Sequence, residues 1–378
     1  MIYVVLILWA AGMIYQFLAL VCLWRFFHRP MPNSPTLGAR QGISVLKPLR
    51  GLESCSREAL ASFLTQDYHP YQVLFGVAEA EDTALPLLKE LKETFPQTEV
   101  DIVVCGEKLG LNPKVSILRQ LEPLARYELM VISDGDVKVG RDFLSQVNGA
   151  WEAHKTGLIC CPYRAGEART LGAQLEALSI SADFIPSVTV AAWLEGIRFA
   201  LGAVMVTSRQ VLAQTGGLAA IADFLADDYQ LGWRIHQAGL DVKLLPYVVE
   251  TTLSAMSFAD YFLHQLRWSR TYRVCRPKGY LAFGITQVLV LSLMVWALSG
   301  FAVFGLGVVA ATLSVRLALA YFSERLCLKG ALPAHAFMWL PLKDLSAFVL
   351  WLLSFLGHKV VWGGLKFRLQ RDGKLVPE

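Results

Sequence analysis

Residues 129–136 read Leu-Met-Val-Ile-Ser-Asp-Gly-Asp. The four apolar residues have the length and composition of a buried parallel strand. This strand ends on Asp134 and Asp136, and open α/β sheets bind their ligands at the carboxyl ends of strands. Two carboxylates so close together repel each other unless a cation lies between them, and a hard divalent cation with a diphosphate on its far side meets that need. The stretch therefore favours a metal-diphosphate site, although Asp-Gly-Asp is also typical of an ordinary solvated turn.

Strand and helix patterns alternate on the amino-terminal side of this stretch. Strands are predicted at residues 43–46, 73–77, 100–104 and 129–132, and helices at 56–65, 85–95 and 115–124. Such alternation indicates a mostly parallel sheet with helices on both faces, a fold class that often binds nucleotides. The chain has no GxxxxGK motif, which excludes the phosphate site of P-loop enzymes.

The composition adds a membrane component to this fold. Of the 378 residues, 54% are hydrophobic and only 17% are charged, and the apolar excess lies at the two ends. Residues 1–27 carry no charge before Arg25 and are long enough to span a bilayer, so we expect a retained anchor. The basic residues that follow place the next domain in the cytosol by the positive-inside rule. Residues 28–41 form a proline-rich linker, and 42–256 form the predicted catalytic domain.

The carboxyl-terminal third is also predicted to meet the membrane. Residues 257–280 interleave basic and aromatic side chains, as interfacial segments do. Residues 281–365 contain candidate spans at 281–298 and 301–321, and a third apolar region at 331–356 that Pro341, Lys343 and Asp344 interrupt. Lys343 and Asp344 could pair with each other, and the number of spans stays open. Arg316 and the two bases after it suggest a return to the cytosol, where the basic tail 366–378 is expected to lie.

The net charge and the cysteine content limit the binding partners and the cellular compartment that we expect. The net charge is only +4, and the basic residues gather beside the hydrophobic segments, so we expect no nucleic-acid partner. The seven cysteines show no CxxC spacing and no regular framework, which is typical of reduced thiols on the cytosolic side.

Two further motifs allow both a structural and a functional interpretation. Asp227 and Asp228 precede a helix-like run, which they could simply cap. Arg267 and Trp268 could belong to an interfacial belt, or the arginine could bind a diphosphate.

Together these stretches resemble the ceramide glucosyltransferase family, membrane enzymes with a GT-A type nucleotide-sugar-binding domain. The family pattern is three separated aspartates followed by [QR]xxRW. The matching positions here are Asp82, Asp134, Asp228 and Arg267–Trp268, and residues 45–51 and 110–114 resemble further family segments. One position departs from the pattern, because His264 stands where the family has Gln or Arg, and Gln265 comes one place later.

The resemblance implies an α/β fold with a GT-A domain plus transmembrane helices. It also implies inverting transfer of a hexose, with glucose as first candidate, from a UDP-sugar to the hydroxyl of a membrane lipid. Ceramide is the expected acceptor, and a hopanoid or other bacterial lipid is the alternative. A polysaccharide synthase, which would need more helices, and a cation-binding receptor or transporter subunit are the competing classes.

The resemblance assigns roles to the matching residues. Asp228 would be the base, and Asp134 with Asp136 would hold Mg²⁺ or Mn²⁺ against the diphosphate of UDP. Asp82 would contact the uridine. Arg267 would add positive charge near the diphosphate, and Trp268 would form the floor beneath the sugar or lipid head. Lys47 and Lys114 are candidates for phosphate contact or, alternatively, solvated surface lysines.

Overall fold

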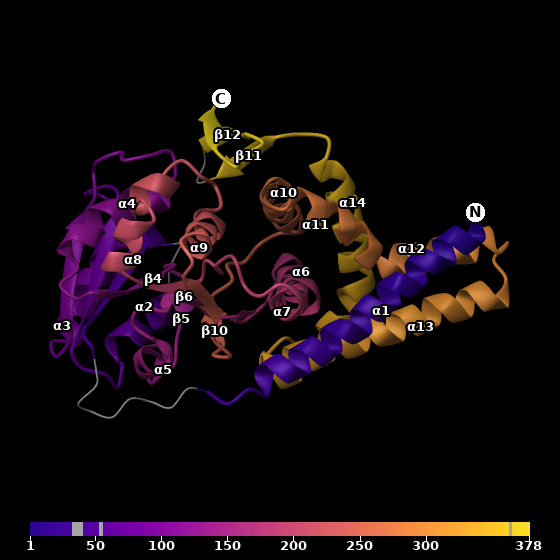
Figure 1. Cartoon of the computed structure of the whole chain (residues 1–378), viewed down its shortest axis with the longest axis horizontal. Coiled ribbons are helices and arrows are strands. Elements are labelled where there is room, and N and C mark those ends of the chain that lie inside the picture. The colour runs from indigo at the N-terminus through magenta and orange to yellow at the C-terminus, as the bar shows by residue number, and fades with distance from the viewer. Residues whose placement is uncertain (32–40, 53–55, 363–364) are drawn as a thin grey trace.

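The computed structural model describes residues 1–31, 41–52, 56–362 and 365–378. An α/β domain lies at one end of the molecule, and a bundle of long apolar helices projects from the other (Figure 1). Most of the predicted linker 28–41 lies outside the described residues, as does Cys55. The other six cysteines are free thiols.

A seven-stranded sheet forms the centre of the α/β domain, in the order β3-β2-β1-β4-β8-β6-β9. Its first four strands run parallel to one another, whereas β8 is antiparallel to both of its neighbours. The four predicted strands and the mostly parallel sheet are therefore confirmed. The strands are β1 (Ile43–Leu49), β2 (Tyr71–Val77), β3 (Glu99–Val104), β4 (Leu129–Ser133), β6 (Thr156–Cys160), β8 (Val204–Ser208) and β9 (Asp241–Leu244).

Helices cover both faces of this sheet, which is why β1, β2 and β4 are buried along their whole length. Ser56 caps the helix that begins at Arg57, because its side chain accepts a hydrogen bond from Ala59 N, as expected for a serine before an apolar run. The predicted helix 115–124 begins slightly earlier and ends at Leu121, because Pro123 cannot continue an α-helix. The helices are α2 (Arg57–Leu64), α3 (Leu85–Thr94), α4 (Pro113–Leu121), α5 (Phe143–Ala150), α8 (Arg209–Gln214) and α9 (Asp227–Gln237).

Three short strands form a second sheet beside the carboxyl end of β4. They are β5 (Val137–Lys138), β7 (Tyr163–Ala165) and β10 (Val249–Thr251), with β10 in the middle. After β10, Thr252 N donates to the carbonyl of Asp136 at 2.9 Å. This small sheet therefore fixes the backbone that follows the Asp-Gly-Asp turn.

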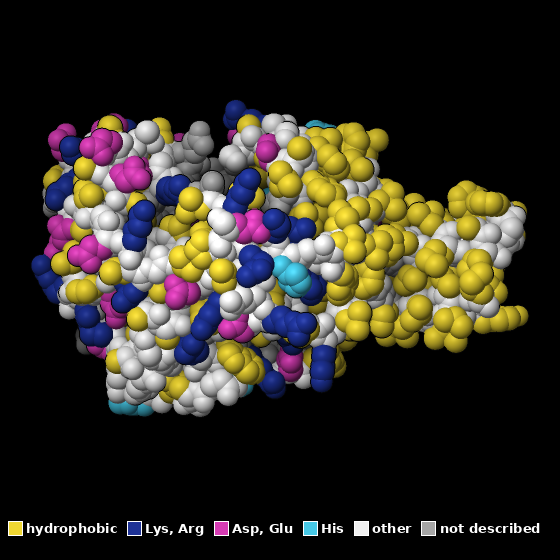
Figure 2. Space-filling view, turned by 90° about the horizontal axis from the view of Figure 1, so that it is seen from above, with side chains coloured by type: hydrophobic (Ala, Val, Ile, Leu, Met, Phe, Trp, Pro, Cys, Tyr) yellow, Lys and Arg dark blue, Asp and Glu magenta, His cyan; other side chains and the backbone are white. Residues whose placement is uncertain are grey.

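Four helices of the described chain are long and apolar enough to cross a membrane by length and composition, or up to five if a bent pair counts as one span. The projecting end of the molecule carries almost only hydrophobic side chains on the face seen in Figure 2. The four are α1 (Ile2–Phe27), the continuous helix Leu171–Leu194, Val303–Cys327 and Ala334–Ser354. The bent pair is α11 (Pro277–Ala282) with its 3-10 extension to Thr286, followed by α12 (Val288–Leu298).

The helix Leu171–Leu194 lies within residues 42–256, which the sequence analysis assigned to the catalytic domain. It consists of α6 (Leu171–Ser179), a π-helical turn Ile180–Phe184 and α7 (Ile185–Leu194). Glu176, Asp183 and Pro186 interrupt its apolar run, so its hydropathy is weaker than that of α1. Figure 1 shows α6 and α7 between the sheet and the remaining apolar helices.

A buried ion network joins these helices. Arg316 of α13 (Val303–Tyr321) donates to Asp344 of α14 (Leu340–Ser354) at 2.7 Å and to Asp183 at 2.8 Å. Lys343 pairs with Asp344 at 2.8 Å and also contacts Asp183, which confirms the expected pairing of Lys343 and Asp344. Arg316 is only 3% exposed, so it is not the charge at a membrane boundary that the sequence suggested. Charges buried among apolar helices persist when they are paired in this way.

The carboxyl terminus, for which a cytosolic tail is expected, has regular secondary structure. It forms an antiparallel sheet of β11 (Lys359–Trp362), β12 (Leu365–Leu369) and β13 (Leu375–Pro377). Phe367 and Leu375 pack with Leu225, and Leu375 N donates to Asp223 O at 2.8 Å. Residues 366–378 therefore fold onto the loop that precedes α9.

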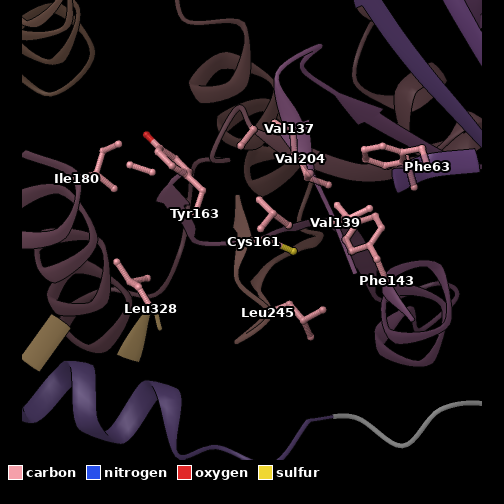
Figure 3. Close-up of a cluster of buried hydrophobic side chains, with 14 of the residues drawn as sticks. Phe63, Val137, Val139, Phe143, Cys161, Tyr163, Ile180, Val204, Leu245 and Leu328 are labelled. Carbon is pink, nitrogen blue, oxygen red and sulfur yellow. The ribbon is translucent and has the colours of Figure 1, made fainter. Parts of the chain in front are cut away.

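The two halves of the molecule share one hydrophobic core. Figure 3 shows its side chains extending from Phe63 of α2 through Tyr163 and Ile180 to Leu328, which follows α13. The helix α10 (Phe258–Cys275) lies between the halves and begins with a capping box made by Ser257 and Asp260. This shared core holds the apolar helices in a fixed position against the sheet.

Candidate active site

A cavity of 1920 Å³ lies where the sheet, α10 and the apolar helices meet. Its lining includes Asp134 and Asp136 after β4, Asp228 at the start of α9, and Arg267 of α10. It continues to Tyr15 of α1. The cavity therefore connects the carboxyl end of the sheet with the helices that are apolar enough for a membrane.

An ammonium group connects two of the acidic sites. Lys114 Nζ lies 2.7 Å from Asp134 Oδ1 and 3.3 Å from Asp227 Oδ2. Burial alone would lower the pKa of Lys114, but the carboxylates of Asp134 and Asp227 raise it above its ordinary value. Lys114 is therefore a fixed cation of the site and not a solvated surface lysine.

The segment 110–114 places this lysine. Asn112 caps α4 by accepting from Val115 N, and its amide donates to Phe224 O at 2.9 Å. Gly110 packs against Ala222 so closely that a methyl group there would approach the Ala222 carbonyl oxygen to 2.6 Å. These contacts join the start of α4 to the loop before Asp227, which brings Lys114 between the two acidic sites.

Asp227 and Asp228 lie in the first turn of α9, but neither caps it. The N-cap position is Ala226, and its side chain makes no capping bond. Burial and the neighbouring Asp227 raise the pKa of Asp228 to about 7, while Lys114 and the N–H of Tyr229 oppose the shift. A carboxylate with a pKa near neutrality is suited to take a proton from a hydroxyl. Gly202 leaves room for it, because a methyl group at residue 202 would come within 2.9 Å of Asp228 Oδ2.

Lys47 donates hydrogen bonds to the start of the Asp-Gly-Asp turn. Its side chain is fully buried, and Nζ donates to Asp134 O at 2.7 Å and to Ser133 Oγ at 3.2 Å. The ammonium also lies 4.1 Å from the ring centre of Phe63. Lys47 is absent from the lining of the cavity. It therefore positions the backbone of Asp134 and is not a solvated surface lysine.

Asp134 and Asp136 have the donor chemistry that a divalent cation needs. Burial and the charge of Asp134 raise the pKa of Asp136 to about 7, so two adjacent anions here lack full compensation. Within the described residues no group of three or more His, Cys, Asp or Glu side chains could hold a metal ion. A cation bound by these two carboxylates would keep its other positions for phosphate oxygens and water, which suits Mg²⁺ or Mn²⁺.

Asp82 lies away from the cavity lining. Its carboxylate accepts from Gly51 N at 3.0 Å and from Ala84 N at 2.8 Å, so it fixes the turn after β1. Two residues of the adjoining turns, Arg50 and Glu79, line the cavity instead. The sequence analysis did not single out Glu79, but its position two residues after the carboxyl end of β2 is a signal that could have indicated it.

The helix α10 carries Arg267 and Trp268 into the cavity lining. In the part of the chain that the structure describes, no carboxylate forms an ion pair with Arg267, and burial lowers the pKa of its guanidinium. A half-buried cation without a carboxylate ion pair is suited to bind an anion such as a diphosphate. The Trp268 ring lies 5.1 Å from His264 and 5.8 Å from Phe184, so it forms part of an aromatic wall.

Glu176 of α6 orients this part of α10 and was missed by sequence reasoning. Its Oε1 lies 3.2 Å from His264 Nδ1, and its Oε2 accepts from Gln265 Nε2 at 3.0 Å. His264 and Gln265, where the chain departs from [QR]xxRW, thus both contact the buried carboxylate of Glu176. A glutamate within an apolar run was the available signal, because such residues face a bundle interior or a cavity.

Comparison with known proteins identifies the relatives. The chain is 26% identical to ceramide glucosyltransferase 1 of Caenorhabditis elegans over 251 residues, which cover 65% of this chain and 52% of that protein. It is 22% identical to ceramide glucosyltransferase 3 of the same organism over 298 residues, 72% of this chain and 61% of that protein. The matches thus span little more than half the length of these relatives.

The fold has a solved counterpart. It is a mannosyltransferase, PcManGT, from Pyrobaculum calidifontis in complex with GDP-Man and Mn²⁺, with a TM-score of 0.54 and 18% identity over 93% of this chain and 98% of that one. The likeness confirms the predicted GT-A fold. A sequence model described as "Glycosyl transferase family 21" matches residues 4–375. The chain therefore belongs to glycosyl transferase family 21, and its predicted relationship to the ceramide glucosyltransferases is confirmed.

Proposed function

We propose that this protein transfers a hexose, glucose first among the candidates, from a UDP-sugar to the hydroxyl of a membrane lipid, with ceramide as the acceptor and with inversion at the anomeric carbon. The proposal rests mainly on one observation: Asp134, Asp136, Asp228 and Arg267 line the same cavity, which continues between apolar helices. The family and the ceramide glucosyltransferase relatives support the reaction class.

The donor would bind at the carboxyl end of β4. Asp134 and Asp136 would hold Mg²⁺ or Mn²⁺, which when bound supplies Lewis-acid stabilisation of the leaving diphosphate. Lys114 stands beside Asp134 and Arg267 lines the same cavity, so both can offset negative charge on the departing UDP. Arg50 and Glu79, from the turns after β1 and β2, lie where a nucleoside could be contacted. Asp82 would then act indirectly, by fixing the turn that contains Gly51.

The acceptor hydroxyl would be activated by Asp228. The carboxylate would take the hydroxyl proton while the oxygen forms its bond to the anomeric carbon, and the bond to the diphosphate oxygen would break with its electron pair leaving on UDP. The base and the leaving group would lie on opposite sides of the sugar, which inverts the anomeric centre. Trp268 and the neighbouring aromatic rings would exclude water from this point.

The apolar helices would place the cavity beside a bilayer, so that the lipid enters from the membrane and the nucleotide sugar from water. We assign the catalytic domain to the cytosolic side, because the exposed bases Arg25 and Arg29 follow the long apolar stretch of α1. The buried ion network of Arg316 and Asp344 contributes nothing to this assignment.

The test is UDP release by the purified full-length protein. A panel of UDP-hexoses would be combined with ceramide, a hopanoid polyol or no lipid, with Mn²⁺ and with EDTA. We expect metal-dependent release with ceramide and loss of that release in Asp134→Asn, with Asp142→Asn, an exposed aspartate beyond the same turn, as the matched control. Release with the hopanoid alone would replace ceramide as acceptor. No release with any pair from folded protein would refute the proposal.

A further inference from the structure

The helix Leu171–Leu194 has a row of polar side chains that lines the cavity. Its members are Glu176, Ser179, Asp183 and Ser187, whose spacing of three, four and four residues places them on one face. All four line the large cavity. Polar side chains within an apolar helix face a bundle interior or a cavity and mark the path of a ligand.

The two charged members of the row already have strong partners. Glu176 is engaged by His264 and Gln265, and Asp183 by Arg316 and Lys343. These contacts fix the helix against α10, α13 and α14. The capacity to bind a ligand therefore rests with the two serines.

Each serine is paired with a tyrosine that also lines the cavity. Ser179 Oγ lies 3.2 Å from Tyr261 Oη of α10, and the Tyr15 hydroxyl of α1 donates to Ser187 Oγ at 3.1 Å. Ser179 Oγ donates to Leu175 O at 2.9 Å, and Ser187 Oγ donates to Asp183 O at 2.6 Å. Since these bonds use both serine protons, we assign Tyr261 as the donor in its pair, as Tyr15 is in the other.

The four hydroxyl groups can therefore only accept further hydrogen bonds. Each hydroxyl oxygen keeps a lone pair, whereas all four protons are committed. A ligand lying along this row must accordingly supply donors, which means O–H or N–H groups. The two pairs are eight residues apart on the helix, or roughly 12 Å at 1.5 Å per residue. Apolar side chains, including Val188, Phe283 and Ile285, line the same cavity.

We propose that the hydroxyl pairs Ser179–Tyr261 and Tyr15–Ser187 bind O–H or N–H groups of the acceptor lipid other than the hydroxyl that reacts. They thereby select a lipid whose polar part carries several donors over a lipid alcohol with a single hydroxyl. The inference rests on the proposed function of the cavity as the site of lipid glycosylation. It also makes α1 a wall of the acceptor site through Tyr15, in addition to an anchor.

The experiment measures UDP release by the full-length protein with two acceptors. Ceramide carries an amide N–H and a second hydroxyl, whereas 1,2-dioleoylglycerol carries one hydroxyl and no other donor. We expect the wild type to prefer ceramide, and Tyr15→Phe and Ser187→Ala each to raise the ceramide KM about fivefold, the factor for one net hydrogen bond. The kcat, the donor KM and the dioleoylglycerol KM should stay unchanged. Tyr3→Phe removes the same atom from a side chain on α1 that is 77% exposed, and should have no effect.

Two outcomes would overturn the inference while leaving the proposed function intact. One is an unchanged ceramide KM in both variants, and the other is an equal rise in KM for the two acceptors, which would indicate a general loss of packing. If a hopanoid polyol is the accepted lipid, it replaces ceramide in the comparison with the same expected rise. Absence of UDP release with every lipid would refute the proposed function and the inference with it.

Discussion

Replacement of Asp228 by asparagine tests the proposed base most directly. Asparagine keeps the size of the side chain but cannot take a proton from the acceptor hydroxyl. A general base contributes about 100- to 10,000-fold to a rate, which corresponds to about 2.7–5.5 kcal/mol in activation free energy. Lys114 forms its ion pairs with Asp134 and Asp227 and not with Asp228, so the donor site should persist. We therefore expect kcat to fall by that factor while the KM for the UDP-sugar changes little.

The pH profile gives this prediction a second readout. Asp228 acts in its deprotonated form, and its pKa is raised to about 7, so at pH 6 only about one molecule in ten would carry the base. Activity of the wild type should therefore fall tenfold per pH unit below about pH 7. The residual activity of Asp228→Asn should lack this limb. Asp227→Asn removes a charge that raises the pKa of Asp228, so the acid limb of the variant's pH–activity profile should move to lower pH.

The assay is steady-state UDP release at saturating ceramide and Mn²⁺, from pH 5.5 to 8.5, with circular dichroism to show that the variants are folded. The reasoning would be refuted by an Asp228→Asn enzyme with a kcat within threefold of wild type. The assignment of the acid limb to Asp228 would be refuted by a variant that keeps this limb, because another group, such as Asp136 with its pKa of about 7, would then cause it.

Three further substitutions test the surroundings of the acids. Lys114→Met removes a charge that lowers the pKa of Asp228, so the acid limb should move to higher pH, and an unmoved limb would contradict the electrostatic role of Lys114. Lys47→Met leaves buried carbonyl groups without a donor and should cost about 1–3 kcal/mol, seen as a lower thermal midpoint, whereas the exposed Lys89→Met should not change the midpoint. Gly202→Ala pushes against Asp228 Oδ2 and should lower kcat about 10- to 100-fold at unchanged ceramide KM, while Gly307→Ala, which has open space around it, should match the wild type.

Features that depend on local pattern could be predicted from the sequence alone. The alternation of apolar runs predicted the first four strands, because a strand buried on both faces needs a continuous apolar stretch. The position of Asp134 after such a strand, and the order of the acids before Arg267, predicted a GT-A domain that the comparisons confirm. The long apolar runs predicted α1 and α13 in the same way.

Contacts between side chains from distant segments became visible only in the folded chain. Lys47 has an ordinary strand position in the sequence, and it becomes a buried donor because parallel pairing of β1 with β4 sets Leu46 beside Ile132 and therefore Lys47 beside Ser133. The partners of Arg316 lie on α14 and on the helix Leu171–Leu194, far away in the chain. Glu176 and Tyr15 likewise acquire a place in the cavity through helix packing. Local periodicity reports which face of an element is buried, but the contact across an interface depends on register and packing between distant segments, which no single stretch of sequence specifies.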